Sequence, residues 1–219
     1  MTKEAIYNQE ICRPGDFSSI ISREEKIDTG SLRVIRYSKP NDICEGKAIR
    51  LANMSGAFPF KAIGRTWRST EHLYLLGEWS TGTEESKDIQ QDVLTATSGY
   101  AAKRYKKNKH KKSIRKDFPL FRHQWMLWCV WQKCLTSAAF REHLLSIPDD
   151  SIIVEVVKKD PIWAAEEDES GRILTGNNGM GKILTICRQA LKQGTNPPID
   201  YALLGKSDIY ILGEKIFRS

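Results

Sequence analysis

Hydrophobic side chains recur at helical spacing in several stretches of the chain. In the clearest of these, Phe118, Phe121, Trp125 and Trp128 follow one another at steps of three, four and three residues. This spacing predicts a helix over 117–134 with one buried face. An aromatic stripe of this kind is more typical of a hydrophobic core than of a cofactor platform. Similar spacing, with capping and turn residues at the ends, predicts further helices that start after Ser69 and that span 85–96, 99–106, 136–146 and 180–191.

Short alternating or β-branched stretches predict a few strands between these helices. We expect one or two more short strands in the C-terminal tail. The mixture predicts an α+β fold, a helix-dominated domain with a small β-sheet. The candidate strands are 32–37, the pair 58–62 and 65–67 on either side of the turn residue Gly64, and 151–157.

The composition agrees with a single domain over residues 1–219. Hydrophobic residues make up 40% of the chain, which excludes a disordered protein, and no repeat or Pro/Gly-rich linker divides it. No stretch approaches the roughly 20 consecutive apolar residues of a membrane span. The N-terminal MTKEAIYNQE lacks the pattern of a signal peptide. We therefore expect no membrane partner and a cytoplasmic location.

The cysteines and histidines predict neither a disulfide framework nor a metal site. The five cysteines are widely spread without a CxxC pair, so reduced thiols are the better interpretation, with Cys129 and Cys134 in the core. The four histidines are scattered as well, without the spacing of a metal centre. The sequence thus predicts no metal and no cofactor. The five cysteines are Cys12, Cys44, Cys129, Cys134 and Cys187.

The formal charge of +7 comes from one segment. Residues 103–116, KRYKKNKHKKSIRK, contain nine lysines and arginines and no acid, whereas the rest of the chain is slightly acidic. Such a tract can contact the phosphates of a nucleic acid or a nucleotide, and it can also be a solvated helix face. Tyr105 is the only aromatic residue within it. The pattern therefore lacks the interleaved aromatic residues expected of a platform for single strands.

Three separated segments are polar where an element of a simple core would be apolar. In 64–74, GRTWRSTEHLY, an acid and His72 stand at a predicted helix start, where the helix dipole alone also favours a carboxylate. In 155–163, EVVKKDPIW, an acid closes the strand and an aspartate follows it, although Asp-Pro is also an ordinary turn dipeptide. In 175–181, TGNNGMG, a glycine-rich turn opens a helix, but it is neither a P-loop nor a Rossmann motif.

The order and spacing of these segments resemble the NADAR (YbiA-like) family over about 49–191. The resemblance is carried by LANM (51–54), PF (59–60), GRTWRSTEHLY (64–74), SGYAAKRYKK (98–107), VEVVKKDPIW (154–163) and GNNGMGKILTICRQAL (176–191). Family members typically have a Ser-x-Glu-His-x-Tyr helix start, an acid that closes a strand, an aspartate with a tryptophan three residues later, and a Gly-x-Asn-x-x-Gly turn. This chain matches the pattern with Glu71, His72, Glu155, Asp160, Trp163, Gly176, Asn178 and Gly181.

The resemblance implies a pocket for a ribose nucleotide, such as ADP-ribose or a phosphoribosyl compound. Known activities of the family break an N-glycosidic bond, in phosphorylated intermediates of the riboflavin pathway or in ADP-ribose attached to guanine. Such cleavage develops oxocarbenium character, which a carboxylate stabilises or a carboxylate-activated water captures. Glu71 and Asp160 are the catalytic candidates, with Glu155 third. The substrate-binding candidates are Trp67, Ser69, His72, Tyr74, Lys103, Trp163, Gly176, Asn178 and Gly181, with Arg65 and Arg68 as further phosphate contacts.

Glu78 departs from the family pattern. Many members have a lysine seven positions after the glutamate of the helix start, and the resemblance implies that it takes part in catalysis in some of them. Because a carboxylate cannot form an imine with an opened sugar, a lysine-linked intermediate at this position is excluded. Three alternatives follow. Another lysine, such as Lys103, forms the covalent intermediate, a carboxylate mechanism operates, or the chain binds the nucleotide without cleaving it. Ala164, where many relatives have glycine, is a smaller departure.

Three functions therefore compete at the level of the sequence. The first is an N-glycosidase that acts on ADP-ribosylated guanine or a related phosphoribosyl compound, including intermediates of riboflavin biosynthesis. The second is a non-catalytic sensor of ADP-ribose or another nucleotide, which Glu78 favours. The third is a nucleic-acid-binding protein that uses 103–116, and it is the weakest because aromatic residues are not interleaved with the charges.

Overall fold

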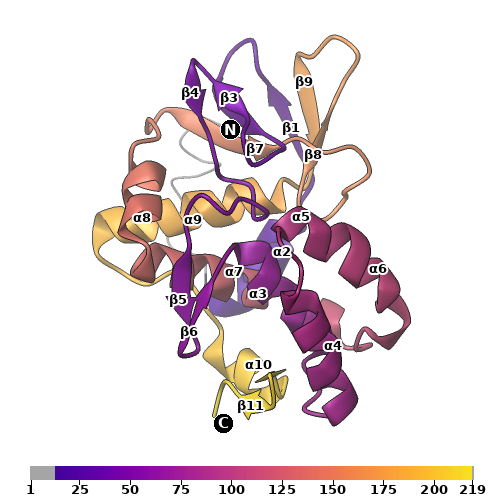
Figure 1. Cartoon of the computed structure of the whole chain (residues 1–219). Coiled ribbons are helices and arrows are strands. Elements are labelled where there is room, and N and C mark those ends of the chain that lie inside the picture. Colours follow the sequence, from indigo (N-terminus) through magenta and orange to yellow (C-terminus); the bar gives the residue numbers. More distant parts are fainter. Residues whose placement is uncertain (1–12, 219) are drawn as a thin grey trace. The chain divides into compact units, whose positions relative to one another are not determined.

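A computed structural model describes residues 13–218 (Figure 1). Contacts between Cα atoms group them into two compact units, each built from two separate stretches of the chain. Unit 1 contains 13–52 and Arg141–Ile199, and unit 2 contains Asn53–Phe140 and 200–218. This grouping does not test the expectation of a single domain, which stays a prediction. Within either unit, the elements combine helices with small sheets, so the chain has an α+β fold in which helix dominates.

Two small sheets form the centre of unit 1. One is antiparallel in the order β1-β9-β8, and the other is the parallel pair of β2 and β7. Both strands of the parallel pair were predicted, whereas β1, β8 and β9 are three- or four-residue strands of mixed polarity that the pattern does not reveal. The strands of unit 1 are β1 (Glu25–Asp28), β2 (Arg33–Tyr37), β3 (Ile43–Cys44), β4 (Lys47–Ala48), β7 (Ser151–Glu155), β8 (Ala165–Glu167) and β9 (Ile173–Gly176).

The long helix α9 (Gly179–Gln193) packs against β7. Its predicted extent is confirmed to within two residues, and its stop signal Gly194 adopts the left-handed conformation (φ 64°) that favours glycine. A shorter helix, α2 (Phe17–Ile21), follows the 3-10 turn η1 (Pro14–Asp16) and also contacts α9. A core cluster of apolar side chains fills the sheet region; its buried members are Ile27, Val154, Ala165 and Leu174.

The helix α7 (Phe118–Thr136) is the centre of unit 2 and confirms the predicted aromatic helix. Its stripe is core, because Phe118, Phe121, Trp125 and Trp128 are all buried. The helix α3 (Thr70–Leu76) packs against it. The two approach so closely that a Cβ on Gly77, just after α3, would lie 2.2 Å from Nε1 of Trp125. Only glycine therefore fits at this crossing.

Around α7 the remaining elements of unit 2 agree with most of the predicted spans. The hairpin of β5 and β6 turns at Ile63 and Gly64, both with positive φ, as a tight hairpin turn requires. The predicted helix 99–106 is present, but its central part is a π-helix and the helical path continues to Lys109. These elements are β5 (Phe60–Ala62), β6 (Arg65–Trp67), η2 (Gly77–Trp79), α4 (Glu84–Leu94), α5 (Gly99–Ala101), the π-helix η3 (Ala102–Lys106), α6 (Lys107–Lys109) and η4 (Lys111–Ser113).

The C-terminal tail contains a helix that the sequence analysis missed. The side chain of Asp200 accepts a hydrogen bond from the backbone N–H of Leu203 at 2.8 Å and caps α10 (Tyr201–Lys206). The expected short strands follow it as the hairpin of β10 (Tyr210–Ile211) and β11 (Glu214–Lys215). An aspartate before an apolar run was the available signal for the helix.

The predicted helix 136–146 corresponds to α8 (Ala138–Leu145). Among residues 13–218, no helix combines the length and the apolar character needed to cross a bilayer. Cys129 and Cys134 are buried, as predicted, and none of the four described cysteines, which include Cys44 and Cys187, is in a disulfide. Cys12 lies outside the described residues.

Candidate functional site

The start of α3 places three polar side chains in the interior of unit 2. Ser69, with an extended backbone (φ −154°, ψ 159°), precedes the helix. The backbone N–H of Glu71 donates to the carbonyl of Asn53 at 3.0 Å, which satisfies one of the amides left free in a first helical turn. Ser69, Glu71 and His72 are 1%, 5% and 2% exposed. The dipole of the helix stabilises the charge of a carboxylate in this turn.

Ser69 does not cap the backbone as its position predicts, because its hydroxyl is bonded to a histidine. Ser69 Oγ lies 2.8 Å from Nδ1 of His72, whose Nε2 lies 3.2 Å from the carbonyl oxygen of Ala96. A carbonyl only accepts, so Nε2 carries the proton and Nδ1 accepts the hydroxyl of Ser69. Burial lowers the pKa of His72, and the nearby charge of Arg68 lowers it further. The imidazole is therefore neutral at pH 7.

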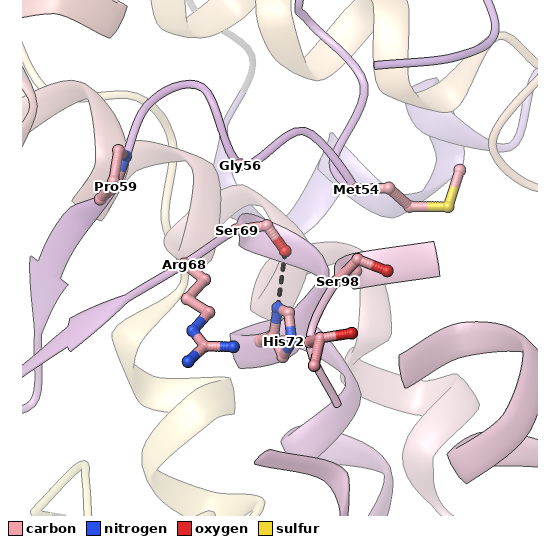
Figure 2. Close-up of a pocket in the computed structure, with 9 residues that line it drawn as sticks. Met54, Gly56, Pro59, Arg68, Ser69, His72 and Ser98 are labelled. Carbon is pink, nitrogen blue, oxygen red and sulfur yellow. Dashed lines mark hydrogen bonds between the residues drawn. The ribbon is translucent and has the colours of Figure 1, made fainter. Parts of the chain in front are cut away.

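A pocket of about 230 Å³ opens beside this serine–histidine pair (Figure 2). Arg68 and His72 also line a neighbouring hollow of about 190 Å³ with Arg65, Thr66, Trp67 and Leu94. Among the described residues, neither Arg65 nor Arg68 has an acid within ion-pair distance. These hollows therefore have uncompensated positive charge that suits an anionic ligand. The first pocket is lined by Met54, Gly56, Pro59, Arg68, Ser69, His72, Thr97, Ser98 and Gly99.

Glu71, Tyr74 and Glu78 share one buried face of α3 and the turn that follows it. Burial raises the pKa of Tyr74 well above its usual value, and the negative charges of Glu78 and Glu71 raise it further, so both carboxylates act on this phenol. Spacings of three and four residues bring such side chains onto one side of a helix. Two buried carboxylates, those of Glu71 and Glu78, therefore lie on the same side of this helical segment, with Tyr74 between them.

Glu78, which stands where many relatives have lysine, is held by a lysine from another element. Its Oε1 forms an ion pair with Nζ of Lys107. Burial raises the pKa of Glu78, although the charges of Lys107 and of exposed Lys103 act in the opposite direction. Its second oxygen, Oε2, is buried and has no hydrogen-bond partner among residues 13–218. Lys103 and Lys107 therefore bring positive charge to the position where the sequence alone shows an acid.

In unit 1, Asn178 ties the start of α9 to the end of β7. Its Nδ2 donates to the carbonyl of Ile153 at 2.9 Å, and its Oδ1 accepts from the backbone N–H of Glu155 at 3.2 Å. Close packing explains Gly181, because a Cβ there would lie 2.0 Å from the carbonyl oxygen of Ile153. Tyr37, opposite Glu155 in the parallel pair, has a buried hydroxyl that no described residue hydrogen-bonds. The glycine-rich turn thus fixes the backbone of Glu155.

Asp160 organises the loop after β7 and borders a pocket. Its Oδ1 accepts from the backbone N–H of Trp163 at 3.0 Å and of Ile162 at 3.3 Å, which is the turn-forming role expected of an ordinary Asp-Pro. The pocket beside it has a volume of about 320 Å³. Asp160 therefore serves the turn and also reaches a hollow. The pocket is lined by Glu24, Asp160, Pro161, Ala164, Glu166, Thr175, Gly176 and Asn177.

The candidate residues form two groups, one in each unit. The first group surrounds the start of α3: Trp67, Ser69, Glu71, His72, Tyr74 and, through its charge on Glu78, Lys103. The second lies between the end of β7 and the start of α9: Glu155, Asp160, Trp163, Gly176, Asn178 and Gly181. Their proposed roles in binding and catalysis stay predictions.

Several residues of these hollows were missed by the sequence analysis. Asn177, rather than its neighbour Asn178, lines the pocket of unit 1, with Thr175 and Glu24. In unit 2, Thr97 and Ser98 line the pocket ahead of the π-helix. The adjacent asparagines were a visible signal, but nothing local says which of two neighbours faces a hollow.

Possible metal ligands do not gather in the part of the chain that the structure describes. No group of three or more histidine, cysteine, aspartate or glutamate side chains there is arranged to hold a metal ion. The group around the start of α3 combines the buried carboxylates of Glu71 and Glu78, a neutral histidine and two arginines, a set suited to a polar organic ligand with anionic groups.

Comparison with known proteins identifies the family. The model of the NADAR domain matches residues 45–192, about two thirds of the chain. The chain belongs to the NADAR family. The solved structures include the NMR structure of the Escherichia coli protein YbiA, which is 22% identical to this NADAR protein and covers 74% of this chain and 86% of its own, with a TM-score of 0.56. This likeness confirms the fold. None of the curated proteins matches the chain. Membership of the NADAR family supports a glycosidase-like or nucleotide-related function.

Proposed function

We propose that this NADAR protein is an N-glycosidase that hydrolyses the bond between ribose C1 and a base nitrogen. The substrate class is ADP-ribose attached to guanine, or a related phosphoribosyl compound. The observation that carries this proposal is the buried carboxylate of Glu71, in the same helical turn that supplies Ser69 and His72 to a pocket. Unpaired Arg65 and Arg68 beside that pocket suit the phosphates of such a substrate.

In the proposed reaction, water supplies the oxygen that replaces the base. A bond forms between the water oxygen and C1 as the C1–N bond breaks, and the base leaves with its electron pair and takes up a proton. Glu71 stabilises the positive charge that develops on the ribose ring. The departing base takes up the proton that the water loses, so the reaction balances. In the separate candidate group of unit 1, Asp160 is the carboxylate proposed to activate the water, with Glu155 as the alternative. No step needs a lysine at position 78, where this chain has a glutamate.

Replacement of Glu71 by glutamine tests the proposed role of its charge. Glutamine is nearly isosteric but carries no charge, so we expect turnover to fall by ~10²–10³ while the circular dichroism spectrum stays that of the wild type. Activity is measured as release of ADP-ribose from an ADP-ribosylated guanine oligonucleotide, whose guanine stays in the strand, and as release of free base from phosphoribosyl intermediates of riboflavin synthesis.

The matched control is Glu84→Gln, which changes an exposed glutamate in the first turn of α4. It should keep wild-type turnover. Wild-type turnover in Glu71→Gln would remove Glu71 from the mechanism, and equal losses in both variants would assign the effect to the fold instead.

The second candidate function is binding of ADP-ribose or another nucleotide without cleavage. The observation in its favour is that Glu78 is engaged in an ion pair with Lys107. Calorimetric titration with ADP-ribose separates the two functions. Binding of ADP-ribose to the wild type without cleavage of any of the substrates would favour the sensor.

A further inference from the structure

Two exposed tyrosines flank one arginine on the helical segment that begins at Gly99. The residues Tyr100 and Tyr105 are 48% and 62% exposed, although large aromatic residues are mostly buried elsewhere in the described chain. The guanidinium carbon of Arg104 lies 5.7 Å from the centroid of Tyr100 and 5.9 Å from that of Tyr105. Arg104 also donates to the hydroxyl of Tyr100. The three side chains therefore form one solvent-facing cluster, the Tyr–Arg–Tyr cluster.

The π-helix explains why the two rings face the same cation. In an ordinary α-helix, residues five apart point about 140° away from one another, since each residue turns by about 100°. The wider π turn over Ala102–Lys106, closed by a bond from the N–H of Lys107 to the carbonyl of Ala102, reduces this angle. Such π turns are rare and frequent at functional sites. The π turn thus brings the ring of Tyr100, which lies outside the basic tract 103–116, to the same side of the helix as the ring of Tyr105.

The positive charge after this cluster is only partly neutralised within the molecule. Asp92 pairs with Lys106 and Lys109, Glu78 pairs with Lys107, and Asp117 pairs with Arg115. The charges of these lysines and of Arg115 are therefore already neutralised by ion pairs within the molecule. By contrast, no acid among residues 13–218 lies within ion-pair distance of Arg104 or of the exposed Lys111, Lys112 and Lys116. These four cations are available to an anionic partner.

We propose that the Tyr–Arg–Tyr cluster is a stacking platform for unpaired bases of a single-stranded nucleic acid. Exposed aromatic rings and a guanidinium plane stack on bases of any sequence, and cations that follow them neutralise backbone phosphates. Lys111, Lys112 and Lys116 supply that second contact. An acidic peptide would satisfy the lysines but would leave the two exposed rings without a function. The platform does not depend on the proposed glycosidase activity, because it binds polymer with or without cleavage.

The first test is fluorescence anisotropy with a labelled 15-nucleotide single strand and its duplex, at several salt concentrations. We expect the wild type to prefer the single strand. Tyr100→Ala and Tyr105→Ala should each weaken this binding by about 5- to 100-fold, the usual range for the loss of one stacked base. Tyr100→Phe should retain most of the affinity because it keeps the ring. Tyr201→Ala is the matched control, since Tyr201 is 56% exposed but lies on α10.

The second test concerns the lysines. The triple variant Lys111→Gln, Lys112→Gln and Lys116→Gln should lower the slope of log Kd against log salt by about 2, since each phosphate contact on a single strand contributes about 0.7. The proposal would be overturned if the duplex bound as tightly as the single strand or more tightly. It would also be overturned if the variant that carries both Tyr100→Ala and Tyr105→Ala kept the wild-type affinity for the single strand. The absence of any oligonucleotide binding, or stronger competition by poly-glutamate than by unlabelled single strand, would overturn it as well.

Discussion

Lys133 is a buried lysine that has no acid within ion-pair distance among residues 13–218. It lies on α7 and is 1% exposed. Its Nζ lies 4.3 Å from the ring centroid of Phe140 and 5.7 Å from that of Phe58, so aromatic faces are its main electrostatic contacts. Burial lowers the pKa of Lys133 from 10.5 to about 8. A buried charge that faces aromatic rings rather than a carboxylate is a cost that folding of the rest of the unit must offset.

Replacement of Lys133 by methionine should stabilise the protein. Methionine fills a similar volume without a charge, so we expect the free energy of unfolding in urea at pH 7 to rise by ~1–3 kcal/mol. The folded pKa is below the unfolded one, so the unfolded state binds more protons between pH 8 and 10.5. Wild-type stability should therefore rise with pH over this window through Lys133, and the variant should lack this rise.

The control for this prediction is Lys61→Met, which changes an exposed lysine of β5. It should leave both the stability and its pH dependence near those of the wild type. A lower stability of Lys133→Met at pH 7 would show that the ammonium group makes a net favourable contribution, contrary to this expectation.

At the scale of elements, the turn between β9 and α9 gives two adjacent asparagines opposite tasks. The side chain of Asn178 is buried and bonded to the backbone of β7, and its own backbone is left-handed (φ 47°), a conformation that asparagine tolerates. Asn177 lines the pocket of unit 1. One asparagine therefore holds the element in place, and its neighbour is available to a ligand.

We expect Asn178→Ala and Asn177→Ala to separate stability from binding. Loss of the two buried bonds of Asn178 should lower the free energy of unfolding by ~2–3 kcal/mol, because the groups on β7 are left unsatisfied. Asn177→Ala should keep the stability within about 0.5 kcal/mol but weaken binding of ADP-ribose, measured by calorimetry. Equal unfolding curves for the two variants would contradict the structural role of Asn178.

At the scale of the whole molecule, neither compact unit is a continuous piece of the chain. The chain passes from unit 1 to unit 2 after Ala52, returns at Arg141 and leaves again after Ile199. The return to unit 1 occurs inside α8, which begins at Ala138 and ends at Leu145. Unfolding of either unit would therefore remove the fixed attachment points of the segments that enter and leave the other unit.

We therefore predict a single cooperative unfolding transition. In differential scanning calorimetry, the van't Hoff and calorimetric enthalpies should agree, and fluorescence and far-UV circular dichroism should give one midpoint. Two resolved transitions, or midpoints that differ between the probes, would show that the units unfold independently and would contradict the expectation of a single domain.

The elements of this protein were largely readable from the sequence, because each depends on spacing within one segment. The aromatic stripe located α7 from the side chains that face the core, and Gly64 and Gly194 marked turns that need a positive φ. The tail helix α10 was missed although Asp200 was a local capping signal. The order of polar segments was also sufficient to identify the NADAR family, which the domain match confirms.

The partners of the polar side chains were decided only by the tertiary structure. Ser69 occupies the predicted cap position, yet its hydroxyl bonds to His72. Glu78 obtains a lysine 29 residues away, and Tyr100 joins Tyr105 around Arg104 only because of a π turn. The physical reason is that periodicity reports which side of an element is buried, whereas a hydrogen bond or ion pair needs two particular atoms within about 3 Å of each other. The orientation of each side chain, the local turn of the helix and the approach of other segments decide which atoms meet.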